Sequence, residues 1–337
     1  MTAPKGRLEA AGLELSRLGL GGTPFGGLHE ANTDAAVAAT VTAALDQGVR
    51  YLDTAPFYGF GLAEHRLGRA LQDVPRERYV LSTKVGRLLR PRRGPAPDIA
   101  PFAESLPFEA VFDYSYDGTM RSLEDSRQRL GLAAIDIALI HDLSPRWHGA
   151  DLPRRLDEAM GGAWRALDEL RRSGDIKAIG VGVNDSRACL DLAARGRFDC
   201  FMLAGRYTLL DHTALKDFLP YCAAEGIGVL LAGPFNSGIL ATGAKAGATF
   251  FYAPADTEIV ERTSRIEAIC AAHNVPLAAA ALQFSASHPA IASVVTGCRS
   301  ATEVERNLAL MALPIPPALW QELATAGLIA RETPLTL

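Results

Sequence analysis

The sequence predicts a closed barrel of eight parallel strands, each followed by a helix, and three observations carry this (β/α)8 fold class. Eight short apolar runs alternate with longer amphipathic runs along the 337 residues. Several short runs are almost uniformly apolar, as in strands covered on both faces of a parallel sheet. No internal repeat and no low-complexity linker divides the chain. We therefore expect one α/β barrel domain over residues 1–337.

The predicted strands are the short apolar runs rich in β-branched residues. They are 17–22, 50–55, 80–86, 135–142, 177–183, 200–207, 228–234 and 293–299.

The predicted helices follow from apolar spacing and end signals. The helix at 33–47 begins after Thr33, an N-cap residue, and ends at Gly48. Gly131 and Gly174 end two others, as glycine does in a left-handed C-terminal cap. The full set is 33–47, 61–72, 117–130, 155–172, 186–195, 213–225, 258–273 and 300–311, with further helical patterns near 276–286 and 316–326.

The remaining segments are an N-terminal turn and three long connections. RLEAAGLELS predicts a short hairpin around Gly12 that covers the barrel floor. The connections 87–115, 143–154 and 235–257 are long for a compact domain, which is typical of functional lids or of solvated insertions.

An open doubly wound sheet is the alternative architecture. Gly19, Gly21 and Gly22 follow the start of a predicted strand, as in a dinucleotide-binding turn. Pro24 and Phe25 come next where such a turn needs the start of a helix, so the spacing disfavours this alternative.

The composition narrows the function classes. The chain is 48% apolar and carries 34 Lys and Arg against 38 Asp and Glu, a net charge of −4, so it lacks the basic excess of a nucleic-acid or membrane-surface protein. No apolar run approaches the ~20 residues that cross a bilayer, and the first residues lack a secretory signal. Five scattered cysteines without CxxC spacing indicate reduced core residues and no metal site. We expect a cytoplasmic enzyme with a small-molecule substrate, and the oligomeric state stays open.

Polar residues gather at the predicted strand ends, where the active site of a (β/α)8 barrel lies. A single such residue is more often structural, but several that meet at one opening indicate a site. They are Asp53, Lys84, His141, Asp142, Asn184, Arg206, Tyr207 and Arg299, with Tyr58 five residues after Asp53.

These residue types suit proton transfer at a substrate oxygen. A buried lysine beside a tyrosine is expected to bring the phenol pKa below about 10, and an aspartate keeps the lysine charged. Such a tyrosine exchanges a proton with a substrate oxygen, and a histidine on the next strand holds the same oxygen. This equipment serves carbonyl–alcohol interconversion, for which a bound cofactor must carry the hydride.

The motifs around these residues resemble the aldo-keto reductase superfamily over essentially the whole chain. They are YLDTAPFYG (51–59), STKVG (82–86), LIHD (139–142), GVGVN (180–184) and TGCRSATEVERN (296–307). The resemblance implies a (β/α)8 barrel and a catalytic tetrad of Asp53, Tyr58, Lys84 and His141, at separations of 5, 26 and 57 residues. DYSYDGTMRSLEDSRQRLGL, GRYTLLD and PFNSGILATG are similar to the bacterial aldose 1-dehydrogenase group, which includes fucose, galactose and pyridoxal 4-dehydrogenases.

The resemblance also implies the residues that hold a nicotinamide cofactor. Tyr207 would stack on the nicotinamide and Asn184 would bind its carboxamide, although Val183 and Ala204 stand where many relatives carry Ser and Gln. The other implied contacts are Gly22, Thr23 and Asp53 at the strand ends, Gly233, Pro234, Phe235, Asn236 and Gly238 around the pyrophosphate, and Gly297, Arg299, Glu303 and Asn307 around the adenosine.

Cofactor choice follows from one position in that set. NADP-preferring relatives commonly carry arginine where this chain has Glu303, so NAD is the expected cofactor. Arg299 lies nearby and leaves NADP as the alternative.

The substrate pocket is the least defined part of the prediction. Phe25, Phe57, Trp147 and His148 lie on loops at the opening and are equally explained by packing. We expect oxidation of the anomeric hydroxyl of an aldose, of the L-fucose, L-galactose or D-threo-aldose type, to the lactone. The alternatives are pyridoxal 4-dehydrogenase, a broad aldehyde or ketone reductase, and a nucleotide-binding regulatory barrel without turnover, against which the intact tetrad argues.

Overall fold

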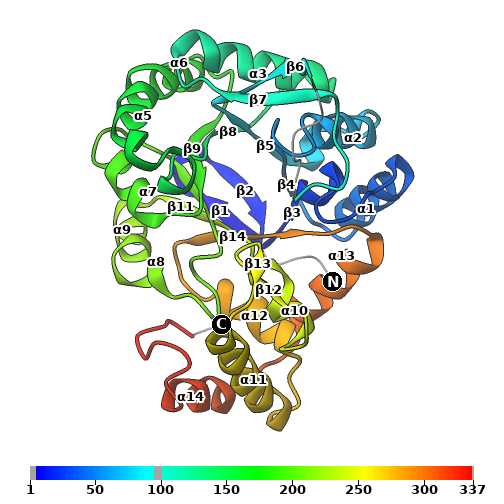
Figure 1. Cartoon of the computed structure of the whole chain (residues 1–337), viewed down its shortest axis with the longest axis vertical. Helices are drawn as coiled ribbons and strands as arrows, with labels where there is room; N and C mark the ends of the chain where they lie inside the picture. Colours follow the sequence, from blue (N-terminus) through cyan, green and yellow to red (C-terminus); the bar gives the residue numbers. More distant parts are fainter. Residues whose placement is uncertain (1–4, 95–100, 336–337) are drawn as a thin grey trace.

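The computed structural model describes residues 5–94 and 101–335, and it confirms the closed parallel barrel (Figure 1). Around the barrel the strands follow the order β3–β4–β5–β8–β9–β10–β11–β14, and every neighbouring pair is parallel. Closure of the sheet excludes the open doubly wound alternative. The strands are β3 (Leu18–Gly21), β4 (Tyr51–Asp53), β5 (Val80–Val85), β8 (Ile137–His141), β9 (Ala178–Val183), β10 (Cys200–Ala204), β11 (Gly228–Ala232) and β14 (Ile291–Gly297).

The helices surround the barrel, and three of them begin or end at the expected signals, while the single helix expected at 213–225 is divided at Asp217. Thr33 caps the first helix by accepting a bond from the Ala36 amide, and Gly131 and Gly174 end two helices in the left-handed conformation. The helices are α1 (Asp34–Asp46), α2 (Leu62–Leu71), α3 (Tyr116–Leu130), α4 (Pro145–His148), α5 (Leu152–Ala159), α6 (Arg165–Ser173), α7 (Ser186–Ala193), α8 (Thr213–Lys216), α9 (Phe218–Glu225), α10 (Ile239–Thr242), α11 (Thr257–Ala272), α12 (Leu277–Ser285), α13 (Ala301–Ala312) and α14 (Pro317–Thr325).

The single helix expected at 155–172 is wrong in one respect. A π-helical turn, Met160–Trp164, separates α5 from α6. In this turn the Ala163 amide donates to the Tyr114 carbonyl at 2.8 Å, and a Cβ at Gly162 would come within 2.4 Å of that oxygen. The wider turn therefore accommodates a close approach to the chain before α3, which no helical periodicity encodes.

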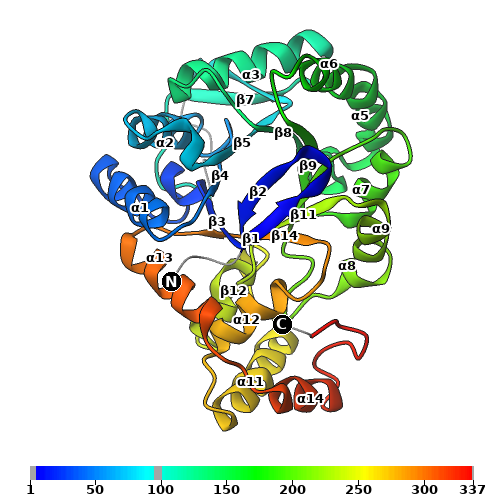
Figure 2. The same ribbon diagram turned by 180° about the vertical axis from the view of Figure 1, so that it is seen from behind.

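The N-terminal hairpin covers the barrel floor, as predicted. Strands β1 (Lys5–Leu8) and β2 (Leu13–Ser16) pair antiparallel around Gly12, whose φ is 63°. Leu8 and Leu15 join the cluster of apolar side chains inside the barrel. Figure 2 shows the hairpin crossing the end of the barrel that faces away in Figure 1.

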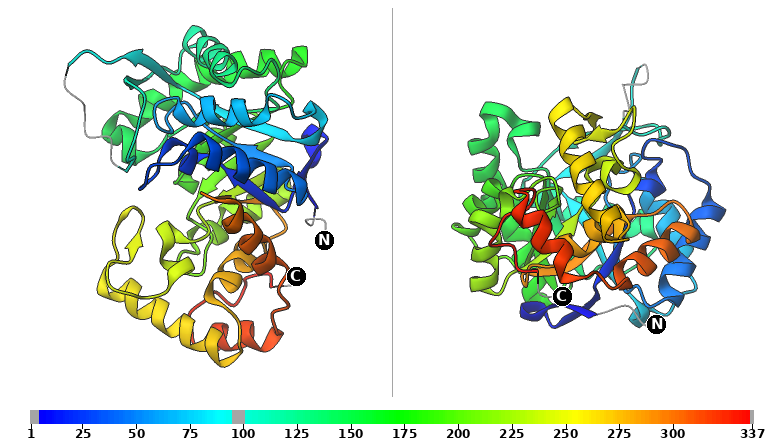
Figure 3. Two further views of the ribbon diagram at one scale, coloured as in Figure 1. Left: turned by 90° about the vertical axis from the view of Figure 1, so that its right-hand side faces the viewer. Right: turned by 90° about the horizontal axis from the view of Figure 1, so that it is seen from below.

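The long connections carry ordered elements on the opposite side. Within 87–115, β6 (Arg87–Pro91) pairs antiparallel with β7 (Phe108–Phe112), while 95–100 lie outside the described residues. After β11, β12 (Thr249–Phe250) and β13 (Ala253–Pro254) form a second small hairpin. Both hairpins project from the side away from the N-terminal hairpin (Figure 3), which is the side of the carboxyl ends of the barrel strands.

Three further features concern cysteines, membrane-spanning segments and metal-binding clusters. All five cysteines are free and buried, as predicted. Among the residues that the structure describes, no single helix has the length and apolar character to cross a membrane, although α11 and α12, bent by 103° at their junction, meet these criteria as a pair. Within the same residues, no group of three or more His, Cys, Asp or Glu side chains is arranged to hold a metal ion.

Candidate active site

The four tetrad residues meet at the carboxyl ends of β4, β5 and β8. The Lys84 ammonium donates to Asp53 Oδ2 at 2.7 Å and to the Thr54 carbonyl at 2.9 Å. It also lies 4.6 Å from the centre of the Tyr58 ring. The Tyr58 and His141 rings stand edge to face, with their centres 6.1 Å apart. The structure therefore brings together the residues that the sequence predicted.

The local sequence holds Asp53 and Lys84 in place. Ser82 and Lys84 are two residues apart on β5 and face the same side. The Ser82 hydroxyl donates to Asp53 Oδ1 at 2.6 Å, so both carboxylate oxygens have partners. On β9, Gly182 lies beside the lysine stem, and a Cβ there would be in van der Waals contact with Lys84 Cε at 3.4 Å. Strand alternation is the sequence signal that could have identified Ser82.

The turn after β3 positions Tyr58. The 3-10 turn Thr23–Gly26 packs directly on the Tyr58 backbone, where a Cβ at Gly26 would come within 2.5 Å of the Tyr58 carbonyl carbon. Gly59 has a φ of 61°, which glycine adopts without strain. Thr23, expected at the cofactor, therefore lies beside the tyrosine, where its side chain opposes the rise of the Tyr58 pKa.

Burial and charge act in opposite directions on Lys84 and Tyr58. Burial lowers the pKa of Lys84, but Asp53 and Tyr58 together raise it to about 12, so the lysine stays charged. Burial raises the pKa of Tyr58 above its usual value, and Lys84 offsets only part of this rise. The expectation of a Tyr58 pKa below 10 is therefore wrong for this structure, because it counted the lysine charge and not the loss of water. Tyr58 holds its proton at neutral pH.

His141 is neutral. Burial, followed by the charges of Lys84 and Arg87, brings its pKa well below the usual value. Its Nδ1 atom is buried and has no hydrogen-bond partner among the described residues. Buried polar atoms are nearly always paired, so this nitrogen is an unused hydrogen-bonding group beside Tyr58 among the described residues.

Arg87 and Tyr114 were not identified from the sequence. Arg87 binds Asp142, the residue after His141, with its Nε and Nη2 atoms at 3.0 and 2.6 Å. The Tyr114 hydroxyl donates to the His141 carbonyl at 2.7 Å. Both lie in the long connection 87–115, where no periodic pattern indicates which way a side chain points.

The loop after β11 has a backbone suited to an anion. Gly233 and Gly238 have φ angles of 64° and 109°, and Asn236 and Ser237 between them are also left-handed. A right-handed residue followed by a left-handed one, here Phe235 and Asn236, is the backbone pattern that turns successive amide groups to one side in anion-binding concavities. The buried Asn236 side chain accepts a bond from Thr208, which fixes the loop. The residues expected at the pyrophosphate thus fit that group.

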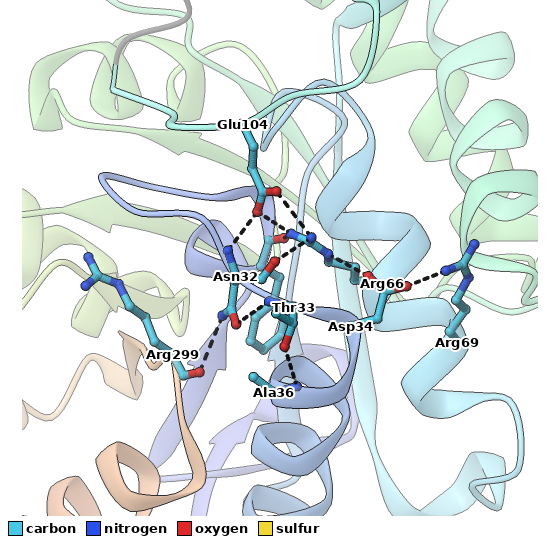
Figure 4. A network of polar contacts seen from close by, with 9 residues as sticks. Asn32, Thr33, Asp34, Ala36, Arg66, Arg69, Glu104 and Arg299 are labelled. Atoms are coloured by element: carbon cyan, nitrogen blue, oxygen red, sulfur yellow. Dashed lines mark hydrogen bonds and ion pairs between the residues drawn. The ribbon is translucent and has the colours of Figure 1, made fainter.

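The residues expected at the adenosine end gather at the start of α13. Glu303 accepts a bond from the Arg299 amide at 2.9 Å, and the Arg299 guanidinium pairs with Glu30 at 2.8 Å. Asn307 is buried and bonds Cys298. Figure 4 shows that the Arg299 carbonyl also joins a polar network through Asn32.

That network connects three elements at the barrel opening. Glu104, from the connection between β6 and β7, accepts bonds from the Asn32 amide at 2.8 Å and from Arg66 at 2.6 Å. Arg66 is buried and also binds Asp34 at the start of α1 (Figure 4). It therefore links α1, α2 and the connection between β6 and β7.

Tyr207 and Asn184 have the least open surroundings of the expected cofactor residues. The Tyr207 side chain is fully buried, with its hydroxyl bonded to Ser287 at 2.7 Å and its ring against Phe284. Stacking on a nicotinamide requires an uncovered ring face, so this role stays a prediction. Asn184 is half-buried, and its carbonyl accepts a bond from Arg206.

The four expected pocket residues fall into two groups. The Phe57 ring contacts the Trp147 ring, and Trp147 and His148 both contact the Phe112 ring. Trp147 is 39% exposed. Phe25 is 1% exposed and packs in the hydrophobic core, so it presents no surface to the opening in this structure.

The barrel and its tetrad define the class of protein. The model of the aldo/keto reductase family matches residues 17–327, and the chain belongs to this family of oxidoreductases. The chain is 44% identical to pyridoxal 4-dehydrogenase of Microbacterium luteolum, covering 97% of this chain and 98% of the relative. It is 40% identical to D-threo-aldose 1-dehydrogenase of a Pseudomonas species, covering 98% and 99%.

The fold is also similar to solved structures. An aldo-keto reductase from Bacillus halodurans superposes with a TM-score of 0.76 at 22% identity, covering 96% of each chain. Glycerol dehydrogenase from Gluconobacter oxydans gives 0.74 at 23%, covering 100% of this chain and 98% of that one. At this identity the similarity concerns the fold alone.

Proposed function

We propose that the protein is an NAD(P)-dependent dehydrogenase that oxidises a cyclic hemiacetal to its lactone, with the C1 hydroxyl of an aldose as the first candidate. The observation that carries the proposal is the convergence of Asp53, Lys84, Tyr58 and His141 on one point of the opening. Aldoses and pyridoxal both form cyclic hemiacetals, because a hydroxyl of the same molecule adds to the aldehyde. The two relatives named above thus share one chemistry.

The cofactor residues support a nicotinamide nucleotide. The left-handed turns between Gly233 and Gly238 suit the pyrophosphate, and the start of α13 suits the adenosine. When bound, the nicotinamide accepts the hydride. Glu303 and the Glu30–Arg299 ion pair favour NAD, because both carboxylates oppose the 2′-phosphate of NADP.

Each of the four side chains has a separate role in the proton transfer. The neutral His141 orients the substrate hydroxyl by a hydrogen bond to its imidazole ring. Tyr58, after losing its own proton, accepts the hydroxyl proton, and Lys84 stabilises the phenolate. Asp53 keeps Lys84 charged and directed at the ring. Protonated Tyr58 serves the reverse reaction, the reduction of an aldehyde or ketone, with the same residues.

Pyridoxal is the second candidate substrate. The 44% identity to pyridoxal 4-dehydrogenase favours it, as do the rings of Phe57 and Trp147 at the opening, which suit a flat pyridine ring.

The test is a cofactor-reduction screen. L-fucose, L-galactose, D-threo-aldoses and pyridoxal are offered with NAD and with NADP, and the product is identified by mass spectrometry. We expect reduction of NAD and formation of a lactone with at least one compound, and loss of both in Tyr58→Phe. If neither cofactor is reduced with any of these compounds, and neither reduced cofactor is oxidised by simple aldehydes, a non-catalytic nucleotide-binding barrel replaces the proposal.

A further inference from the structure

Next to the tetrad, three aromatic rings surround a buried guanidinium. Arg87, the first residue of β6, is 4% exposed. Its Cζ atom lies 4.0 Å from the centre of the Phe57 ring and 4.2 Å from those of Phe112 and Trp147. A cation over a ring face is attracted by the ring's quadrupole, more strongly where water is excluded. The rings come from the loop after β4, from β7 and from α4. Arg87 therefore contacts all three of these segments at once.

The same guanidinium fixes the backbone beside the catalytic histidine. Its Nε and Nη2 atoms both bind Asp142 Oδ2. Asp142 has a φ of 62°, which costs free energy in a residue other than glycine, and such residues cluster at functional sites. Its amide donates to the Gly182 carbonyl at 2.9 Å, and its Oδ2 lies 3.6 Å from His141 Nε2. The ion pair therefore stabilises a strained turn and sets a carboxylate against the imidazole.

We propose that Arg87 is a positioning and specificity-determining residue, which with Asp142 holds the His141 imidazole and with Phe57 and Trp147 forms the aromatic wall of the substrate opening. The inference rests on the proposed function. Arg87 itself is too buried to touch substrate, so it acts through the residues that it holds.

The charges around His141 indicate how removal of Arg87 changes the pKa of His141. The His141 ring faces Lys84 from β5, Arg87 from β6, Asp142 directly after its own strand and the Tyr58 ring from the loop after β4. The Tyr114 hydroxyl bonds the His141 carbonyl and His148, and not the His141 ring. Loss of Arg87 removes one of the two cations and leaves the Asp142 carboxylate unpaired beside the ring. Both changes favour the imidazolium, so the pKa of His141 rises.

The test compares three variants. Arg87→Met removes the charge, Arg87→Lys keeps the charge without the flat two-point contact, and Arg90→Met is the control, since Arg90 is exposed on the same strand. Histidine-ring NMR follows protonation, with the His141 signal assigned by its absence in His141→Gln. We expect His141 to titrate at higher pH in Arg87→Met than in wild type, and not to shift in Arg87→Lys or Arg90→Met.

Steady-state kinetics test whether Arg87 holds the aromatic wall of Phe57 and Trp147 in the position that binds substrate. We expect Arg87→Lys to raise the KM about tenfold, equivalent to about 1.4 kcal/mol, with a smaller effect on kcat. The compact ammonium cannot stack as the flat guanidinium does against all three rings that form the wall. Arg90→Met is expected to leave both unchanged. A KM within twofold of wild type in Arg87→Lys overturns the specificity role.

The NMR result separates this inference from the proposed function, because it needs no turnover. An inactive wild type overturns the proposed function alone, whereas an unmoved His141 signal in folded Arg87→Met overturns the positioning role. Should Arg87→Met not fold, Asp142→Asn is the second variant. Removal of its carboxylate is expected to lower the pH at which His141 titrates, and a rise would contradict the arrangement.

Discussion

Replacing Lys84 with methionine leaves a buried carboxylate without its cation. Asp53 and Lys84 are 3% and 1% exposed, and their charged atoms are 2.7 Å apart. Removing one partner of such a pair typically destabilises a protein by ~3–5 kcal/mol, because the other charge stays buried and unpaired. We therefore expect the free energy of unfolding to fall by about 4 kcal/mol at neutral pH. Turnover is expected to fall by about 10²–10⁴-fold, since Tyr58 loses the group that stabilises its phenolate.

The pH dependence of this loss distinguishes an unpaired charge from a packing defect. Burial already raises the pKa of Asp53 above its usual value, and Lys84 opposes that rise. Without Lys84 the folded-state pKa of Asp53 is higher still and lies above its unfolded value. The variant is then relatively more stable below the unfolded pKa and loses that stability as pH rises through the folded pKa. The destabilisation is therefore expected to shrink in acid and to be largest at neutral pH.

The assay is urea unfolding of wild type, Lys84→Met and Lys84→Met/Asp53→Asn at neutral and acid pH. The double variant is expected to recover most of the stability without recovering activity, because no unpaired charge remains. Lys177→Met is the control, since Lys177 is exposed and its partner Asp136 keeps Arg76. A loss below about 1 kcal/mol in Lys84→Met, equal to that of an exposed pair, would refute the reasoning.

Three further outcomes follow from the site. Tyr58→Phe is expected to lower turnover by about 10²–10⁴-fold while nucleotide binding, followed by fluorescence titration, survives, and near-native turnover would remove Tyr58 from the proton relay. Oxidation is expected to gain kcat/KM as pH rises from neutral to alkaline, because burial raises the pKa of Tyr58 and the phenolate becomes more abundant with pH; a flat oxidation profile contradicts this. Carbonyl reduction is expected to stay level until the pH passes the raised pKa of Tyr58 and to fall above it. Glu303→Arg is expected to move the NADP-to-NAD ratio of kcat/KM about fivefold to tenfold towards NADP, and exposed Glu305→Arg on the same helix is expected to move it less. An NADP-preferring wild type that Glu303→Arg leaves unmoved would exclude the preference for NAD.

The barrel and the convergence of Asp53, Lys84 and His141 at its opening could be predicted from the sequence itself. The catalytic tetrad that they form with Tyr58 was implied by the resemblance of the motifs to the family, and it stays a prediction. Local sequence signals sufficed to predict where some helices begin and end, as with Thr33 and Gly131, because caps and left-handed turns depend on neighbouring residues. Parallel closure then puts every strand's carboxyl end at one opening. Asp53, Lys84 and His141 therefore had to meet once their strands were identified.

Only the tertiary structure decided the environment of each group. The direction of the Tyr58 pKa depends on how much water the packed barrel removes as well as on the charge of Lys84, and the sequence pattern contains only the charge. The burial of Tyr207 depends on Ser287, 80 residues away along the chain. Arg87 is surrounded by rings from three separate connections, so its role is set by distances between loops. Such contacts have no period along the chain, and desolvation is a property of the whole fold.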